Sequence, residues 1–88
     1  MDSKIVVAVN MFTINQSVYL PNGEIVHASL KKLPELVSDL CYEKDIYTVE
    51  IRGAGAYIPK VIRNIEETEL TKYNAHKITF LRNKEFKA

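Results

Sequence analysis

The sequence predicts an α/β domain, a five-stranded mixed sheet with two helices in the chain order β-β-β-α-β-α-β. Three observations support this class. β-branched runs stand early, in the middle and late in the chain, an Asn-Gly pair separates two of the early runs, and two other stretches repeat apolar residues with helical spacing. Because 88 residues have room for one core, we expect a single domain over residues 1–82 and a basic C-terminal tail at 83–88.

The first three predicted strands form a meander. Residues 5–9 read Ile-Val-Val-Ala-Val, and such a run without alternation predicts a central strand that is covered on both faces. Residues 17–20 and 25–28 flank Asn22-Gly23. Asn-Gly between apolar runs is the strongest short signal for a hairpin, and a two-residue turn there would require positive φ at both residues.

Two helices are predicted from apolar residues that recur every three or four positions. These residues are Leu33, Leu36, Val37, Leu40 and Cys41 in the first helix, and Ile58, Val61, Ile62 and Ile65 in the second. Pro34 and Pro59 stand near the two starts, where a missing amide hydrogen costs no helical hydrogen bond. Each apolar face must pack on the sheet, so the helices are expected to connect strands.

Two further strands are predicted after the helices, at residues 46–52 and 76–81. Both alternate in side-chain character, which is typical of strands. Because strand-helix-strand connections are right-handed, the strands at 5–9, 46–52 and 76–81 should form a parallel set. The strands at 25–30 and 76–81 would then be the two edges of the sheet.

Composition excludes several classes of function. Twelve Lys and Arg against eleven Asp and Glu give a net charge of +1, which provides no net field toward nucleic acid or an acidic membrane. A single cysteine, Cys41, cannot form an internal disulfide. We therefore expect the protein to be located in a reducing cytoplasm, or in the host cytoplasm if the protein is viral. The first apolar run is too short for a signal sequence or a membrane span, and no membrane partner is expected.

The predicted order of elements resembles the ribonuclease H-like superfold over nearly the whole chain. In nuclease members, an Asp on the first strand and an acid near the end of the fourth bind Mg²⁺, and the matching positions are Asn10 and Glu50. Asn10 is neutral, and Glu50 alone cannot hold the ions of two-metal chemistry. The resemblance therefore implies a fold without catalytic residues, metal or cofactor. The segment 9–13, Val-Asn-Met-Phe-Thr, and the small size also resemble small proteins of large tailed phages.

Two candidate sites for anions follow from the sequence, each with a simpler alternative. A phosphate or nucleotide could bind where small residues end the fourth strand and polar residues end the first; the residues concerned are Asn10, Thr13, Gly53, Ala54, Gly55 and Lys60. The alternative is two tight turns whose polar groups satisfy their own backbone. Nucleic acid could bind the basic C-terminal segment through Lys72, Lys77, Arg82 and Lys84. The alternative is a charged edge that prevents aggregation.

The function that we predict is protein interaction without catalysis. The strand at 25–30 carries no charged residue after Glu24, and an uncharged edge strand can pair with another copy or with a partner. Tyrosine is frequent at interfaces because it combines apolar area with one hydrogen-bonding group. The interface residues that we predict are Tyr19, Ile25, Val26, His27 and Tyr47, and the predicted assembly is a homo-oligomer.

Overall fold

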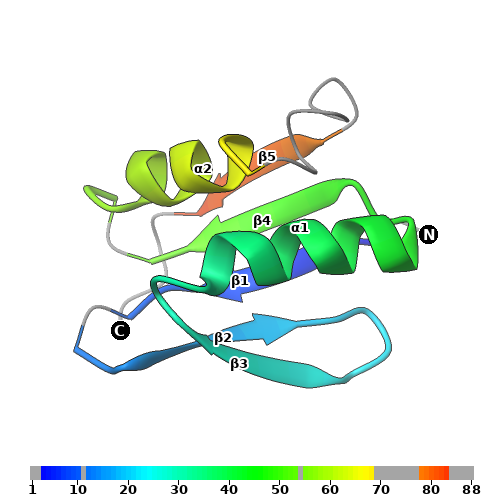
Figure 1. The fold of residues 1–88 in the computed structure, drawn as a ribbon, viewed down its shortest axis with the longest axis horizontal. Helices are drawn as coiled ribbons and strands as arrows, with labels where there is room; N and C mark the ends of the chain where they lie inside the picture. Colours follow the sequence, from blue (N-terminus) through cyan, green and yellow to red (C-terminus); the bar gives the residue numbers. More distant parts are fainter. Residues whose placement is uncertain (1–2, 11, 54, 69–77, 84–88) are drawn as a thin grey trace.

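A computed structural model describes residues 3–10, 12–53, 55–68 and 78–83 (Figure 1). The elements are β1 (Ile5–Ala8), β2 (Asn15–Tyr19), β3 (Ile25–Ser29), α1 (Leu33–Lys44), β4 (Thr48–Arg52), α2 (Ile58–Glu66) and β5 (Thr79–Asn83). The number, type and chain order of these elements confirm the predicted α/β class.

One mixed sheet holds all five strands in the order β3-β2-β1-β4-β5. The pairs β1–β2 and β2–β3 are antiparallel, whereas β1–β4 and β4–β5 are parallel. The meander, the parallel set of β1, β4 and β5, and the edge positions of β3 and β5 are therefore confirmed. β1 lies at the centre, between an antiparallel and a parallel neighbour.

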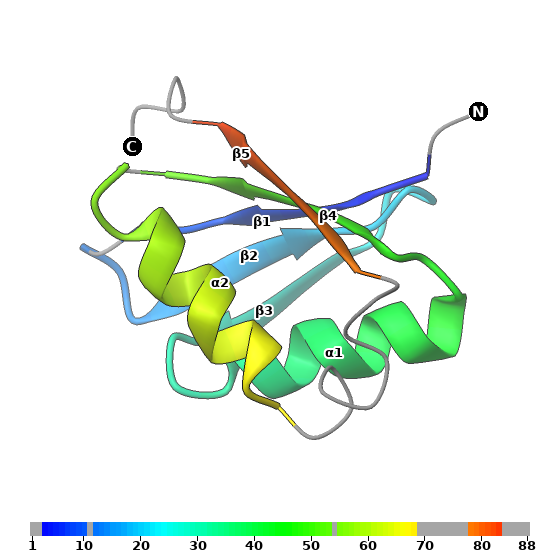
Figure 2. The same ribbon diagram turned by 90° about the horizontal axis from the view of Figure 1, so that it is seen from above.

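Both helices pack on the same face of the sheet (Figure 2). The connection through α1 runs from β3 to β4, and the connection through α2 runs from β4 to β5, so both move along the sheet in the same direction. Right-handed connections that advance in the same direction place their helices on the same side. The described chain thus forms two layers, and we call the face of the sheet opposite the helices the open face.

The expectation that the first strand is covered on both faces is wrong. Ile5 and Val7 point toward the helices and are fully buried, whereas Val6 and Ala8 point to the open face and are only partly buried. An unbroken apolar run shows that both faces of a strand avoid water to some degree. It does not show whether helices or neighbouring side chains provide the cover, because that depends on the direction of the later connections.

The core lies between the helices and the sheet. Its buried apolar residues are Ile5, Val7, Val9, Val18, Leu20, Leu33, Val37, Leu40, Cys41, Val49, Ile51, Ile58, Val61, Ile62 and Ile65. The predicted helical faces agree with this set, except that Leu36 is only partly buried. Ser38 of α1 is also buried, and its hydroxyl lies 2.5 Å from the hydroxyl of Thr68, just beyond α2. This pair links the two helices.

The hairpin between β2 and β3 is present, but its turn differs from the predicted one. Gly23 has a φ of 92°, whereas Asp45 is the only described non-glycine residue with positive φ, so Asn22 does not adopt the left-handed conformation. The Gly23 amide donates to the Leu20 carbonyl at 3.0 Å, and the Leu20 amide donates to the Glu24 carbonyl at 2.9 Å. This is a three-residue loop with a bulge at glycine, which suits the fixed negative φ of the intervening proline.

Several strand boundaries also differ from the prediction, most clearly those of β2, β4 and β5. β2 begins at Asn15 rather than at residue 17, and β4 begins at Thr48 rather than at residue 46. β5 spans Thr79–Asn83 rather than 76–81; residues 76 and 77 lie outside the described chain. The predicted domain limit at residue 82 therefore falls inside a strand. Pairing explains the shift, because β5 follows β4 residue by residue up to the partner of Arg52.

Candidate functional site on the open face and the β3 edge

A row of side chains crosses the open face from one edge of the sheet to the other. Strand register places Ile25, Tyr19, Val6, Glu50 and Leu81 side by side on β3, β2, β1, β4 and β5. Four of the five are apolar or aromatic. Ile25 is 50% exposed, and Tyr19 and Leu81 are each 42% exposed. The row therefore presents apolar surface to solvent toward both edges, with one acid near its middle.

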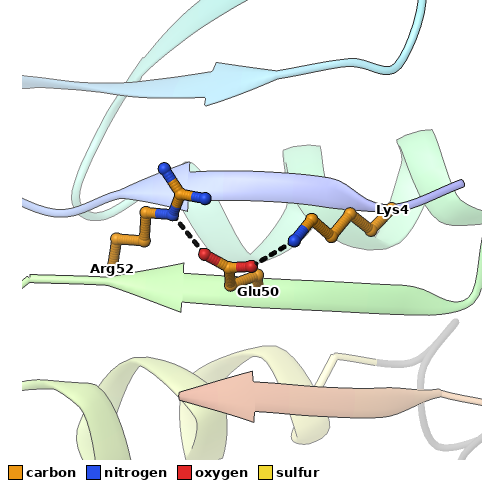
Figure 3. Close-up of polar contacts among 3 residues, drawn as sticks. All are labelled: Lys4, Glu50 and Arg52. Atoms are coloured by element: carbon orange, nitrogen blue, oxygen red, sulfur yellow. Dashed lines mark hydrogen bonds and ion pairs between the residues drawn. The ribbon is translucent and has the colours of Figure 1, made fainter. Parts of the chain in front are cut away.

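That acid, Glu50, is enclosed by two cations on the open face (Figure 3). Lys4 Nζ lies 2.5 Å from Glu50 Oε1, and Arg52 Nε donates to Glu50 Oε2. The Glu50 side chain is only 7% exposed, whereas those of Lys4 and Arg52 are 39% and 38% exposed. The helices do not cover this face, so the stems of the two cations contribute to shielding the carboxylate. The three side chains together carry a net charge of +1.

This arrangement is unlike the carboxylate cluster of a two-metal nuclease. Both Glu50 oxygens are engaged by cations. The Asn10 side chain accepts a hydrogen bond at 3.0 Å from the amide of Phe12, within its own turn. Among the residues that the structure describes, no three His, Cys, Asp or Glu side chains are grouped as metal ligands would be. A metal at Glu50 would first have to displace Lys4 and Arg52.

The β3 edge exposes the backbone of alternate residues. The Leu20 amide donates to the Glu24 carbonyl, which makes this pair a hydrogen-bonded one. Hydrogen-bonded and non-hydrogen-bonded pairs alternate in an antiparallel ladder, so the amide and carbonyl groups of Ile25, His27 and Ser29 point away from β2. In Figure 1 no described segment lies beyond β3 on that side. The edge also carries no charged side chain.

The predicted interface residues lie in two places. Tyr19, Ile25 and His27 share the open face near the β3 edge, where Ser17 Oγ lies 3.2 Å from His27 Nδ1. Val26 points to the helix side and packs against the core. Tyr47 precedes β4 and also packs against the core; partial desolvation and the nearby Asp45 carboxylate raise its pKa. The structure thus brings three of the five together and places the other two elsewhere.

The polar residues after β1 bond to their own loop. The Asn10 amide donates to Gln16 Oε1 at 2.5 Å, and Gln16 Nε2 donates to the Thr13 carbonyl at 3.2 Å. The Thr13 hydroxyl lies 3.1 Å from the Asn10 carbonyl oxygen and 2.9 Å from that of Asn15. These bonds support the simpler alternative for Asn10 and Thr13, in which polar turn residues satisfy the local backbone.

Gly53 has a packing role where β4 ends. A Cβ atom at Gly53 would lie 2.8 Å from the Val9 carbonyl oxygen. The Val9 amide also donates to the Arg52 carbonyl at 2.8 Å, so the segments that end β1 and β4 lie close together here. Ala54 lies outside the described residues, and Gly55 is half-buried. Lys60 lines a hollow of about 40 Å³ that Leu30, Tyr57, Val61 and Asn64 complete. An anion site at these residues remains a prediction.

The predicted nucleic-acid segment lies mostly outside the described chain. Lys72, Lys77 and Lys84 fall there, and only Arg82 can be placed. Arg82 is exposed on the edge strand β5, beside Ile51 of β4. This candidate also remains a prediction.

Cys41 is buried in the apolar face of α1. Burial raises the pKa of its thiol to about 11, so at neutral pH the group is a thiol and not a nucleophilic thiolate. The described helices include none that is long and apolar enough to cross a membrane.

Sequence reasoning missed an apolar tip on the loop between β1 and β2. Phe12 is 95% exposed and Ile14 is 85% exposed. Gln16, which holds the base of this loop, is buried. The available signal was the placement of two large apolar residues within a segment otherwise rich in turn formers, but the segment was interpreted from its polar members only.

Comparisons of the chain with protein-family models, with curated proteins and with solved structures find no match.

Proposed function

We propose that this protein is a non-catalytic interaction module that associates with a second copy through the β3 edge. The observation that carries the proposal is an uncharged edge strand whose outward amide and carbonyl groups at Ile25 and His27 have no described chain beside them, although the Ser29 carbonyl already accepts a hydrogen bond from the Lys32 amide. Unpaired strand edges recruit other strands unless charge, proline or a covering segment prevents it. None of these three devices is found along β3 itself.

A two-fold axis at His27 gives the simplest pairing. Two antiparallel copies of β3 would then place His27 opposite its counterpart and Ile25 opposite Ser29 of the second copy. The facing pairs would exchange roughly four backbone hydrogen bonds, two at His27 and one at each pair of Ile25 with Ser29, because the Ser29 carbonyl is already bonded to the Lys32 amide. Ile25 and Tyr19 lie on the open face next to this junction, so their exposed surface would add apolar contact across it.

We also propose that the chain is related to the ribonuclease H-like superfold but serves as a scaffold. The sheet order β3-β2-β1-β4-β5, with β2 antiparallel to β1, supports this relation. The neutral Asn10 and the cation-bound Glu50 support the absence of metal chemistry. The buried free thiol of Cys41 fits a reducing compartment such as the cytoplasm.

The test is the mass in solution of wild type and of Ile25→Lys, measured by light scattering at several concentrations. Ile25 is half exposed, so lysine fits the fold while placing a charge on the edge. We expect wild type to exceed the chain mass of 10.1 kDa and the variant to show a marked loss of association. Val26→Lys is unsuitable because Val26 packs against the core.

Leu81→Lys is the matched control, since Leu81 is comparably exposed on the opposite edge strand. It should associate as wild type does. Wild type that stays at 10.1 kDa at all concentrations would overturn the proposal. So would an association that Leu81→Lys abolishes and Ile25→Lys leaves intact.

A further inference from the structure

We propose that the chain has a second self-contact, in which copies join head to tail. The apolar tip is formed by Phe12 and Ile14. The tip of one copy would occupy a hollow at the opposite end of the next copy. This contact uses no part of the β3 edge, and it does not depend on the pairing proposed above.

The apolar tip is supported by hydrogen bonds among the described residues of its loop. Phe12 and Ile14 are 95% and 85% exposed, so nearly the whole of each side chain is available to a partner. The loop beneath them is fixed by the contacts of Gln16 with the Asn10 amide and the Thr13 carbonyl. A preorganised loop loses little conformational entropy on binding. Such contacts suit a shaped protein hollow, and an isoleucine does not stack on nucleic-acid bases.

The hollow lies between the β2–β3 hairpin and the end of α1. It is lined by Leu20, Pro21, Asn22, Lys44 and Ile46, and its volume is about 170 Å³. An apolar cavity of about 150 Å³ accepts a benzene molecule. The hollow therefore has room for one phenyl ring such as that of Phe12. Three of its five lining residues are apolar, which suits such a ring.

The two ends carry complementary charges. Asn15 pairs with Ser29, so the loop of the apolar tip lies beside the β3–α1 connection, which contributes Lys31 and Lys32. The described charged side chains at the strand ends and helix starts on this side are Lys31, Lys32, Glu35, Arg52, Lys60 and Arg82, of which Arg52 is bound to Glu50. Next to the lining of the hollow lie Glu24, Glu43 and Asp45, all exposed, together with Lys44 and with Lys4, whose ammonium is bound to Glu50. A second copy thus offers both the missing apolar ring and the opposite charge.

Because the apolar tip and the hollow lie at different places on the molecule, the contact between them allows further copies to be added at both ends. The β1–β2 loop and the β2–β3 hairpin lie at opposite ends of the longest axis, which spans 31 Å (Figure 1). A contact between unlike surfaces leaves a free tip on one copy and a free hollow on the other. Such copies continue to add and form a chain or a ring. Pairing through β3, in contrast, uses the same surface on both copies and stops at two.

The experiment uses Ile25→Lys as its background, so that β3 pairing cannot contribute and the two proposals fail separately. In this background we add Phe12→Asp, which removes the ring, or Pro21→Trp, which fills the hollow. Pro21 is exposed in the turn, a position that accepts most residues. Thermal unfolding followed by circular dichroism verifies that each protein is folded. Sedimentation equilibrium then gives the mass of each protein alone and of their equimolar mixture.

The background protein should exceed 10.1 kDa increasingly with concentration, and its association should weaken in high salt. Phe12→Asp and Pro21→Trp should each weaken association at least about tenfold, the loss expected when a buried aromatic contact is removed. Their mixture should form a species of two chains and no larger one, because only one tip and one hollow remain intact.

Tyr57→Asp is the matched control, because it changes an exposed aromatic residue to an acid at the same end of the molecule. It should keep most of the association of the background and lose only what one charge contributes to the attraction between the two ends. A background that remains at 10.1 kDa throughout would overturn the proposal. A mixture that stays monomeric would do the same, as would an equal loss in Tyr57→Asp. If Pro21→Trp does not fold, Glu43→Lys with Asp45→Lys replaces it in the mixture and must give the same result.

Discussion

In the charge group of Lys4, Glu50 and Arg52, removing the acid and removing the two cations should lower the stability of the fold by very different amounts. Glu50→Gln leaves two cations whose side chains are each more than a third exposed, so water can solvate them; we expect a loss of about 1 kcal/mol. Lys4→Met with Arg52→Met takes two cations away from a carboxylate that is only 7% exposed. Removing the partner of a fully buried charge costs roughly 3–5 kcal/mol, and because this group is slightly exposed we expect a loss of about 3 kcal/mol.

The measurement is urea-induced unfolding with linear extrapolation to water. Adding Glu50→Gln to the double variant should recover at least half of the lost stability, since it removes the buried charge that has lost both cations and keeps the shape of the side chain. Lys60→Met with Arg63→Met makes the same kind of change on the exposed side of α2 and should cost less than about 0.5 kcal/mol. The reasoning is refuted if Glu50→Gln is the more damaging change, or if adding it to the double variant lowers stability further.

Two more predictions concern single residues, and both use the same unfolding measurement. Gly53→Ala should cost roughly 2–3 kcal/mol of stability, because the new Cβ would lie 2.8 Å from the Val9 carbonyl oxygen. Gly23→Ala, whose Cβ would have nothing within 4 Å, should cost only the ~1 kcal/mol of its positive φ. Equal costs would contradict the close approach of Gly53 to Val9. The pKa of Cys41 is raised from 9.0 to about 11 in the folded protein, so its stabilisation is complete below pH 9 and is lost as pH rises toward 11. Wild type should therefore lose more stability than Cys41→Ala over that interval, and parallel pH profiles would show that the thiol is not buried.

The order and type of the elements could be predicted because local patterns determine them. Helical spacing identified α1 and α2, and the handedness of connections then gave the parallel set and both edges. Whether β1 was covered on both faces could not be read locally, since the answer depends on where two later helices pack. The hairpin was also detected from Asn22-Gly23, but the preceding proline changed the type of turn.

The candidate site was only partly predictable, for a related reason. The uncharged edge strand is visible in the sequence, and Ile25 and His27 lie where an alternating strand would place them. Because side chains alternate along a strand, Val26 points to the other face, so the consecutive residues 25–27 could not all belong to one surface. The group around Glu50 joins residues 46 positions apart, and it exists because β1 and β4 are parallel neighbours in a register that no local pattern states.

The two proposed contacts reinforce each other through the direction of the strands. β3 runs parallel to β1, so its start lies at the end of the molecule that holds the hollow and its last residue lies at the end that holds the apolar tip. Antiparallel pairing of β3 with a second copy reverses that copy, and the pair then offers one tip and one hollow at each end. Two pairs that meet end to end can make both contacts together, which raises the effective concentration of the second contact. Wild type should therefore assemble at lower concentration than Ile25→Lys, in which each head-to-tail contact must form alone.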